Sequence, residues 1–455
     1  MMNPLRTLQD RKNRIRSVLA TTDETISLCN IPMLRENWKN SEGDRLFPSI
    51  LRGFLIDERT IRAVSLKVKM LLTLLMKAHE LWMSRQEVRD LLPCPYGGWL
   101  PETVQSWDST LFLRIGMAPF IYQDYIQPSV KFLSIRGDGV NPGFVSHQNL
   151  SKNQLALWGH LGIDTTTCSS LDSMNFFAEQ LKPWLQSEGG GASPFALLFD
   201  EQSGEGERRA ILELSSYLGE RGIETELAGI HSAIDMPALS ALLNTVPAAT
   251  LAGLEPPLPA ALLSLLEKGR LFNMAPLPVF AQGIFELLTD PCYTEALGAP
   301  PIETVKRMLP WTRIIRDGEI TTPAGQRASL RDYARTARQY LVLRPQWGED
   351  VDALAGSEMT EDEWVQTVES ALSMPCNYVL QEKVEYPSAA LPFVEGDAVQ
   401  WRKALFTIDV FASSHGDIGG IAADVYALDD SVDIMSSSPF SSEYLGFTSV
   451  MKAEL

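Results

Sequence analysis

Apolar residues recur at every third or fourth position through Thr60–Leu92, the spacing that places them on one face of an amphipathic helix. The positions concerned are Val64, Leu66, Val68, Leu71, Leu72, Leu75 and Leu81. Prolines and glycines between positions 93 and 98 predict the end of this helix. Two apolar runs, Thr110–Ile115 and Val130–Ile135, then predict strands joined by a hairpin connection around Gln123–Pro128.

The middle of the chain predicts a different arrangement. Ser187–Ser193 contains three consecutive glycines and is typical of a linker. A short apolar run, a Glu- and Arg-rich helical segment and a second apolar run follow, over Phe195–Asp200, Glu205–Arg221 and Ile223–Leu227. This succession predicts a βαβ unit and therefore a parallel sheet. No GxGxxG motif accompanies it, so the pattern does not indicate a dinucleotide site.

The last third predicts further helices and strands. In chain order they are a helix over Leu330–Gln339, a strand over Tyr340–Leu343, a helix over Glu361–Leu372, a strand over Tyr378–Gln381, and paired antiparallel strands Ala404–Ala412 and Ile421–Ala427 around a Gly416–Gly420 turn. Thr360 stands before the second helix and Glu363 follows three residues later, which predicts a capping box.

Composition narrows the class of protein. The 455 residues allow two or three domains, since a globular domain holds roughly 100–200 residues. Lys and Arg total 39 against 57 Asp and Glu, which gives a net charge of −18. That charge repels a phosphate backbone, so we do not expect a nucleic-acid partner.

The cysteines and histidines show no metal-binding or disulfide pattern. Five cysteines are spread without a CxxC pair, and five histidines occur without HxH or HxxxH spacing. No run of about 18 apolar residues is present to span a membrane. The first residues are charged and lack a signal-peptide core, so we expect a cytoplasmic protein without a membrane partner.

Three motifs follow one another between about Pro310 and Val384. They are Leu309–Arg313 (LPWTR) with the later strand Tyr340–Pro345 (YLVLRP), Gly356–Glu358 (GSE) with Trp364 and Ala371, and Tyr378–Val384 (YVLQEKV). In this order and spacing they resemble the circularly permuted (type 2) ATP-grasp family, of the kind related to glutathionylspermidine synthase.

The resemblance implies an α/β (α+β) fold, ATP-grasp-like, with mixed sheets and a central βαβ domain. Residues 1–150 would form a helical region and strands of the core, residues 151–305 the central substrate domain, and residues 306–455 the nucleotide cleft. In such proteins ATP lies between two sheets and magnesium bridges its phosphates. A carboxylate attacks the γ-phosphate, and an amine then displaces phosphate to form an amide.

The positions that match the family's metal ligands are altered. The R-x-D motif falls on Arg114-Ile115-Gly116, which keeps the Arg and replaces the Asp by Gly116. The E-x-N motif falls on Ser134 and Arg136. Magnesium prefers hard oxygen ligands, so these changes argue against a magnesium site of the family's kind.

The positions that match the family's phosphate-binding groups are altered as well. The lysine of the LVLKP strand is Arg344, and a second lysine falls near Gln282. Gln346–Val351, which includes Trp347, replaces a Gly-rich cover. An Arg expected on a late strand falls on Ala423 or Asp424.

Two hypotheses follow. The first is a degenerate ligase-fold protein that serves as a binding or partner subunit, beside an active ligase paralogue or with a small amino-acid or peptide ligand. Nucleotide binding stays open through Arg114, Arg344, Gln381, Glu382 and Val384, so ATP remains a candidate cofactor. A strand end with a solvent-facing acid also accounts for the Gln381-Glu382 pair.

The second hypothesis is an active ATP-dependent carboxylate–amine ligase that makes a small peptide-like metabolite with relocated metal ligands. Asp138 and Asn141 are the first candidates for these ligands, followed by Asp409 and Asp417. An Asx turn between glycines accounts for Asp138 without a metal. Thiol chemistry at Cys94 or Cys376 is a third reading, against which both cysteines suit small buried hydrophobes.

Overall fold

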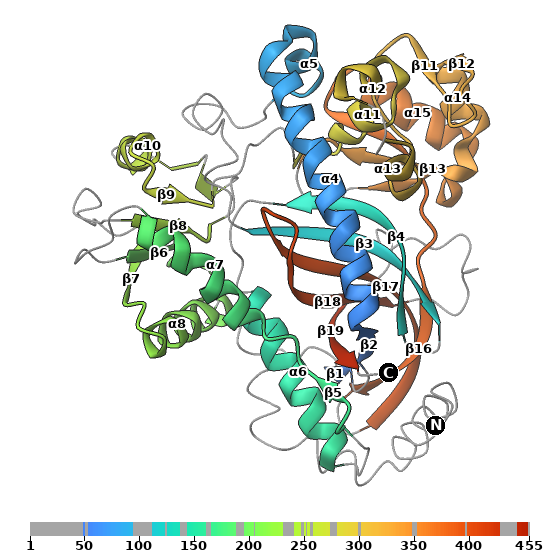
Figure 1. The fold of residues 1–455 in the computed structure, drawn as a ribbon. Coiled ribbons are helices and arrows are strands. Elements are labelled where there is room, and N and C mark those ends of the chain that lie inside the picture. Colours follow the sequence, from blue (N-terminus) through green and yellow to red (C-terminus); the bar gives the residue numbers. More distant parts are fainter. Residues whose placement is uncertain are drawn as a thin grey trace.

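The computed structural model describes residues 49–50, 53–93, 112–122, 125–136, 143–160, 165–187, 195–203, 205–230, 241–246, 250–251, 253–254, 258–273, 280–298, 302–347, 353–395, 398–427 and 444–453. These residues form a large sheet, a parallel sheet and a small antiparallel sheet, with helices packed against each (Figure 1). Within these ranges, no helix is long and apolar enough to cross a membrane.

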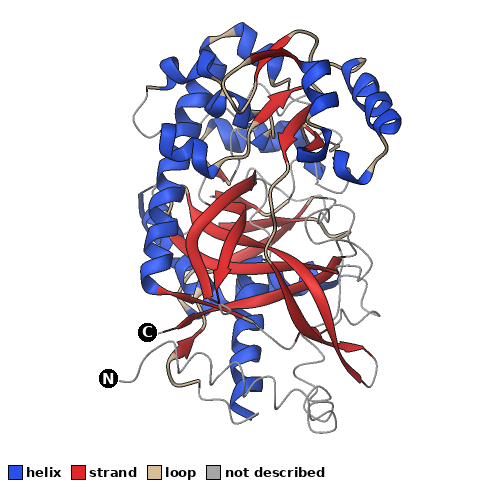
Figure 2. Ribbon diagram, turned by 90° about the vertical axis from the view of Figure 1, so that its right-hand side faces the viewer, coloured by secondary structure: helices blue, strands red, loops and turns tan. Residues whose placement is uncertain are grey.

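The large sheet closes on itself. It contains β1 (Ser49–Ile50), β2 (Phe54–Asp57), β3 (Phe112–Tyr122), β4 (Tyr125–Arg136), β5 (Cys168–Ser169), β16 (Ser388–Glu395), β17 (Ala398–Ser413), β18 (Ile418–Ala427) and β19 (Tyr444–Ala453). The pairings β17-β18-β19-β2-β4-β3 return to β17 and form a closed ring (Figure 2). Closure is possible because β17 is 16 residues long: one edge pairs first with β16 and then with β3.

Helix α4 (Glu58–Ser84) covers one face of this sheet with the apolar side that the sequence repeat predicts, except at Leu66. Leu66 is 64% exposed, because it lies two residues from both Val64 and Val68 and so points away from the buried side. It begins at Asp57, whose Oδ1 accepts from the Thr60 N–H at 2.6 Å. The predicted single helix is interrupted at Arg85, and α5 (Gln86–Leu91) follows. Arg89 compensates for the break, since its Nη1 donates to the Met83 carbonyl at 2.6 Å at the end of α4.

Helices α6 (Gly143–His160) and α7 (Ser173–Ser187) pack on the other face of the large sheet. On this face Phe112, Phe411 and Ala422 share a core with Phe177 of α7. The rings of Phe112 and Phe177 stack with centroids 4.4 Å apart. This core continues into the central sheet, so the large sheet and the central sheet are packed together through α7.

The central sheet is parallel, in the order β7-β6-β8-β9, and confirms the predicted βαβ unit. Its elements are β6 (Phe195–Phe199), α8 (Glu205–Glu220), β7 (Thr225–Gly229), β8 (Ala241–Asn244), α10 (Leu258–Glu267) and β9 (Leu271–Phe272). The side chains of Phe195 and Leu197 enter the core under α7 and α8. Those of Ala196 and Leu198 enter the core under α10, on the other face of the sheet. Because both faces are buried, the strand is apolar throughout.

The small sheet has the order β10-β15-β13-β14, all antiparallel. It contains β10 (Thr312–Ile314), β13 (Leu341–Pro345), β14 (Leu354–Ala355) and β15 (Tyr378–Glu382). Helices α14 (Leu330–Thr336) and α15 (Glu361–Leu372) cover one face. The hairpin β11 (Glu319–Thr321) and β12 (Arg327–Ser329) and the helices α11 (Ile284–Thr289), α12 (Pro291–Leu297) and α13 (Ile302–Met308) complete this part of the chain.

Local predictions for this region are confirmed, with differences at two turns. The capping box forms, because Thr360 Oγ1 accepts from the Glu363 N–H at 3.3 Å and Glu363 Oε2 accepts from the Thr360 N–H at 2.8 Å. The helix predicted over Leu330–Gln339 ends at Thr336, and Arg338–Tyr340 form a 3-10 turn, so Tyr340 does not belong to the strand. In the large sheet, the hairpin connection predicted around Gln123–Pro128 is shorter, because β4 begins at Tyr125. Pro128 lies within β4, opposite a register shift of β3.

Candidate functional site

One face of the small sheet carries polar side chains towards the large sheet. Along β13, Leu341 and Leu343 enter the core beneath α14 and α15, so Arg344 projects from the opposite face. Gln381 of β15 pairs with Val342 and lies on that same face. Two of the predicted nucleotide-binding residues, Arg344 and Gln381, are therefore brought together.

Protein acceptors enclose Arg344, which is only 1% exposed. Its Nη1 donates to Gln381 Oε1 at 2.7 Å and to the Leu133 carbonyl of β4 at 3.3 Å. Gln381 Nε2 donates in turn to Thr312 Oγ1 at 3.0 Å. Gln282, with its amide oriented to satisfy both ends, donates to the Leu133 carbonyl at 3.2 Å and accepts from Arg344 Nη2 at 3.3 Å. Arg344 thus joins the small sheet to β4.

The segment after Gln381 makes contacts within the protein. Glu382 Oε2 accepts from the Trp311 N–H at 3.1 Å. The Lys383 N–H, in the segment expected to read adenine, donates to the Tyr340 carbonyl at 2.8 Å. Val384 is buried and packs against β3 and β4. The predicted residues Glu382 and Val384 therefore lie where the small sheet meets the large one, and Glu382 is paired with Leu341 and not with Arg344.

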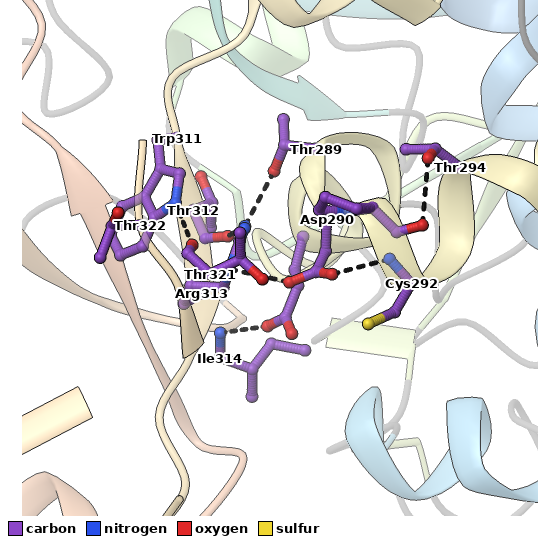
Figure 3. A network of polar contacts seen from close by, with 12 residues as sticks. Thr289, Asp290, Cys292, Thr294, Trp311, Thr312, Arg313, Ile314, Thr321 and Thr322 are labelled. Atoms are coloured by element: carbon purple, nitrogen blue, oxygen red, sulfur yellow. Dashed lines mark hydrogen bonds and ion pairs between the residues drawn. The ribbon is translucent and has the colours of Figure 1, made fainter. Parts of the chain in front are cut away.

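The LPWTR motif forms a buried polar network (Figure 3). The Arg313 side chain is 1% exposed, and its Nε lies 3.1 Å from Asp290 Oδ2. Its guanidinium carbon lies 5.0 Å from the centroid of the Trp311 ring, and its Nη1 donates to Thr289 Oγ1 at 3.2 Å. Burial lowers the pKa of Arg313, which Asp290 counteracts. The motif that carries the family resemblance therefore holds β10 against the helices before it.

A second buried acid supports the same strand. Glu286 is fully buried, and its Oε2 accepts from the Ile314 N–H at 2.5 Å. Its Oε1 accepts from Arg316 Nη2 at 2.6 Å. Burial acts against the charge of Arg316, yet the hydrogen bond to Glu286 raises the pKa of the guanidinium. The sequence reading missed Glu286 and Asp290, although an acid in the apolar segment 284–290 signals a buried partner.

Arg114 lies on the large sheet with two carboxylates. Its Nε donates to Asp409 Oδ2 of β17 at 2.6 Å, and its Nη2 contacts the same oxygen. The same Nη2 donates to Asp424 Oδ2 of β18 at 3.2 Å. The side chains of the two acids are 10% and 14% exposed, against 33% for Arg114. Burial raises the pKa of Asp409, but attraction by Arg114 outweighs it and holds the pKa below its usual value.

The neighbouring positions test whether a magnesium ion of the family's kind fits. Arg114 of β3 is paired directly with Arg136 of β4, and Gly116 is paired with Ser134. These four positions offer one hydroxyl and two guanidinium groups, and the nearby carboxylates of Asp409 and Asp424 are already paired with Arg114. Magnesium needs hard oxygen ligands, usually carboxylates, so the residues present do not fit it. In the part of the chain that the structure describes, no group of three or more His, Cys, Asp or Glu side chains is placed to hold a metal ion.

The remaining predicted positions are separate from these clusters. Asp138, Asn141 and Cys94 lie outside the described residues. Asp417 forms an ion pair with Lys69 of α4 at 2.6 Å, beside the turn between β17 and β18. Cys376 is partly buried against the core of α4, and burial raises the pKa of its thiol, which disfavours the nucleophilic thiolate.

Comparisons with known proteins identify the fold. No family model and no curated protein matches the chain. A glutathione synthetase-like effector from Globodera pallida, solved in its apo form, aligns over 94% of this chain and 96% of its own with a TM-score of 0.60 and 12% identity. A putative γ-glutamylcysteine synthetase from Methylobacillus flagellatus aligns over 87% of this chain and 89% of its own at 11% identity, with a TM-score of 0.37 that is too low to indicate a shared fold. The chain thus shares its mixed α/β fold with the glutathione synthetase-like effector.

Proposed function

We propose that this glutathione synthetase-like fold serves as a binding or partner subunit and does not itself catalyse ATP-dependent amide formation. The enclosure of Arg344 carries the proposal. A phosphate-binding site requires a cationic side chain that contacts the phosphate. The guanidinium of Arg344 instead donates hydrogen bonds to Gln381, Gln282 and the Leu133 carbonyl.

The replacement of two lysines of the family by Arg344 and Gln282 accounts for the stability of this side-chain arrangement without a ligand. The family resemblance places lysines at Arg344 and near Gln282. Two ammonium groups at these positions repel each other because both are positively charged, and neither can accept a hydrogen bond from the other. Here the amide of Gln282 accepts from the guanidinium of Arg344 at 3.3 Å. Arg344 and Gln282 therefore bind each other directly, without an anion between them.

The large sheet supports the same proposal. Phosphoryl transfer relies on metal and cationic groups that neutralise charge on the transferring phosphate. Arg114 is matched by Asp409 and Asp424, and the neighbouring Gly116, Ser134 and Arg136 do not form a magnesium site. Arg114 is thus paired with carboxylates, and Arg344 is hydrogen-bonded to neutral acceptors of the protein.

The test measures nucleotide binding and turnover in the full chain. Melting temperature is recorded without nucleotide, with ATP and magnesium, and with ATP and EDTA, and ADP release is followed with amino acids and γ-glutamylcysteine as substrates. We expect no metal-dependent rise in melting temperature and no ADP release above that of heat-denatured protein. ADP release by the wild-type chain that requires magnesium would establish the active ligase instead.

A variant at Gln282 tests the effect of this one replacement. Q282K places an ammonium group beside Arg344 and removes the acceptor, so its melting temperature should fall. Tripolyphosphate should restore part of the loss in Q282K and have no effect on the wild type. The isosteric Q282E variant, which supplies a negative charge to Arg344, should show no response to tripolyphosphate.

The partner role is tested separately. Tagged protein isolated from its native host should co-purify at a fixed ratio with an intact ligase of the same fold. Its addition should change the kcat or KM of that ligase. A chain that leaves both constants unchanged contradicts the partner role, whatever its own nucleotide binding.

A further inference from the structure

The outer face of helix α4 carries a regular stripe of exposed side chains. From Leu66 to Met83 the exposed positions recur at alternating spacings of three and four residues, which is the heptad spacing of helices that pack against another helix. Three of these side chains are large and apolar: Leu66 is 64% exposed, Met76 44% and Met83 37%. The large sheet is covered by the opposite side of α4 and does not account for them (Figure 1). The full stripe consists of Leu66, Lys69, Thr73, Met76, Glu80 and Met83.

The two charges of this stripe lie at equal distances from its two ends. Lys69 follows Leu66 by three residues, and Glu80 precedes Met83 by three residues. If the direction of the helix is reversed, Glu80 takes the position of Lys69 and an apolar residue stays at each end. The stripe is therefore complementary in charge to an antiparallel copy of itself.

We infer that this stripe of α4 binds a second copy of the chain, with the two helices packed antiparallel about a two-fold axis. Leu66 then packs against Met83 of the second copy, and Lys69 forms an ion pair with Glu80 of the second copy. Every contact is made twice, because the same surface is used on both copies. The inference goes beyond the proposed function and holds whether or not the chain binds nucleotide.

The charges also decide the direction of packing. In a parallel pair, residues at the same heptad position face each other. Lys69 would then lie against Lys69, and Glu80 against Glu80, so like charges would repel at two levels of the contact. The antiparallel pair replaces both repulsions by attractions and is the arrangement that we expect.

Lys69 is available for the second copy although it has a partner in its own chain. It pairs with Asp417 at 2.6 Å, but both side chains are about half exposed, and such surface ion pairs contribute little. The stripe spans 17 residues from Leu66 to Met83, which corresponds to about 26 Å of helix. A contact of this length is small for a stable interface, so we expect a dissociation constant in the micromolar range or above.

The experiment is sedimentation equilibrium of the full chain over a range of concentrations, without nucleotide. The wild-type mass should rise with concentration from that of one chain, 50.5 kDa, towards that of two. K69E and E80K each place like charges opposite each other twice, and each should raise the dissociation constant about tenfold or more. The double variant K69E/E80K restores opposite charges in the antiparallel pair and should recover the wild-type constant.

Two further variants separate this contact from general effects of charge and folding. R208E reverses a charge on the exposed side of α8 and should dimerise as the wild type does. L66S removes an apolar contact at both ends of the stripe and should weaken dimerisation without lowering the melting temperature, since Leu66 is exposed in the single chain.

Three results would overturn the inference. The first is a wild-type chain that stays monomeric at all concentrations. The second is a dimer that K69E, E80K and L66S leave intact, because it would use another surface. The third is a dimer that both single charge variants dissociate and K69E/E80K does not restore, because opposite charges would then not face each other in the wild type.

Discussion

The guanidinium of Arg344 on β13 donates to the backbone carbonyl of Leu133 on β4, a residue 211 positions earlier in the chain. This bond joins the small sheet to the strand whose following residues, Ser134 and Arg136, pair with Gly116 and Arg114. The contacts of Arg344 and those of Arg114 are therefore both built on one short segment of β4.

The first prediction concerns this bond. R344M removes the donor to the side-chain oxygens of Gln381 and Gln282, while the Leu133 carbonyl keeps its bond from Gln282. Each buried acceptor left unsatisfied costs about 1–3 kcal/mol. We expect the free energy of unfolding in urea to fall by about 2–5 kcal/mol. R327M is the control, because the Arg327 side chain is 81% exposed. Equal stability of R344M and R327M would refute a structural role for Arg344.

The second prediction concerns the buried pair Arg313–Asp290. D290N leaves a guanidinium that is 1% exposed without its counter-charge, at a cost of about 3–5 kcal/mol. R313M/D290N removes the charge as well and should lose much less than the two single variants added together. Chemical unfolding of all four proteins gives the coupling energy. Additive losses would show that the two side chains do not stabilise each other.

The third prediction is a pH dependence. Attraction by Arg114 holds the pKa of Asp409 below its ordinary value of 3.8 in the folded protein, although burial opposes this. Near and below that value the unfolded chain binds the proton more readily, so acid favours unfolding. The contribution of Asp409 is complete above the ordinary value and is lost as pH falls through the folded pKa.

The measurement is the difference in free energy of unfolding between wild type and D409N, followed from neutral pH down to pH about 2. This difference should be constant at neutral pH and shrink below pH about 4. A difference that grows as the pH falls would mean that burial, and not Arg114, dominates at Asp409.

The fourth prediction concerns the glycine of the GSE motif. A Cβ at Gly356 would lie 2.4 Å from the backbone carbonyl of Arg338, which no side-chain rotation relieves. G356A should therefore lose about 1–3 kcal/mol of stability. At Gly219, within α8, a Cβ meets nothing within 4 Å, and G219A should gain about 0.5–1 kcal/mol. Losses of the same size in both variants would contradict the steric explanation.

Short sequence patterns predicted the structural features that depend on neighbouring residues only. Helix α15 begins and ends where predicted and carries the expected capping box, because Thr360 and Glu363 are three residues apart. The succession of motifs between Pro310 and Val384 predicted the fold for a similar reason, since each motif lies within one element or turn.

Side-chain contacts between segments far apart in the chain could not be predicted from such short patterns. The sequence shows that Arg344 replaces a lysine, but not that its acceptors are Gln381 and a carbonyl of β4. The sequence also marks Asp424 as a departure from the family, but not that Arg114 joins it to Asp409. Such partners depend on strand order and register, which a hydrophobic pattern does not contain.

The closed ring of the large sheet has a consequence for biosynthesis. Strand β19 comes last of the six along the chain, yet it lies between β18 and β2, which is the first. Until residue 453 has left the ribosome, β2 and β18 each present an open edge with unpaired amide groups. Two strand edges of the nascent chain therefore stay unpaired and prone to aggregation until β19 has been synthesised. Chaperones that cover such edges should raise the yield of folded protein.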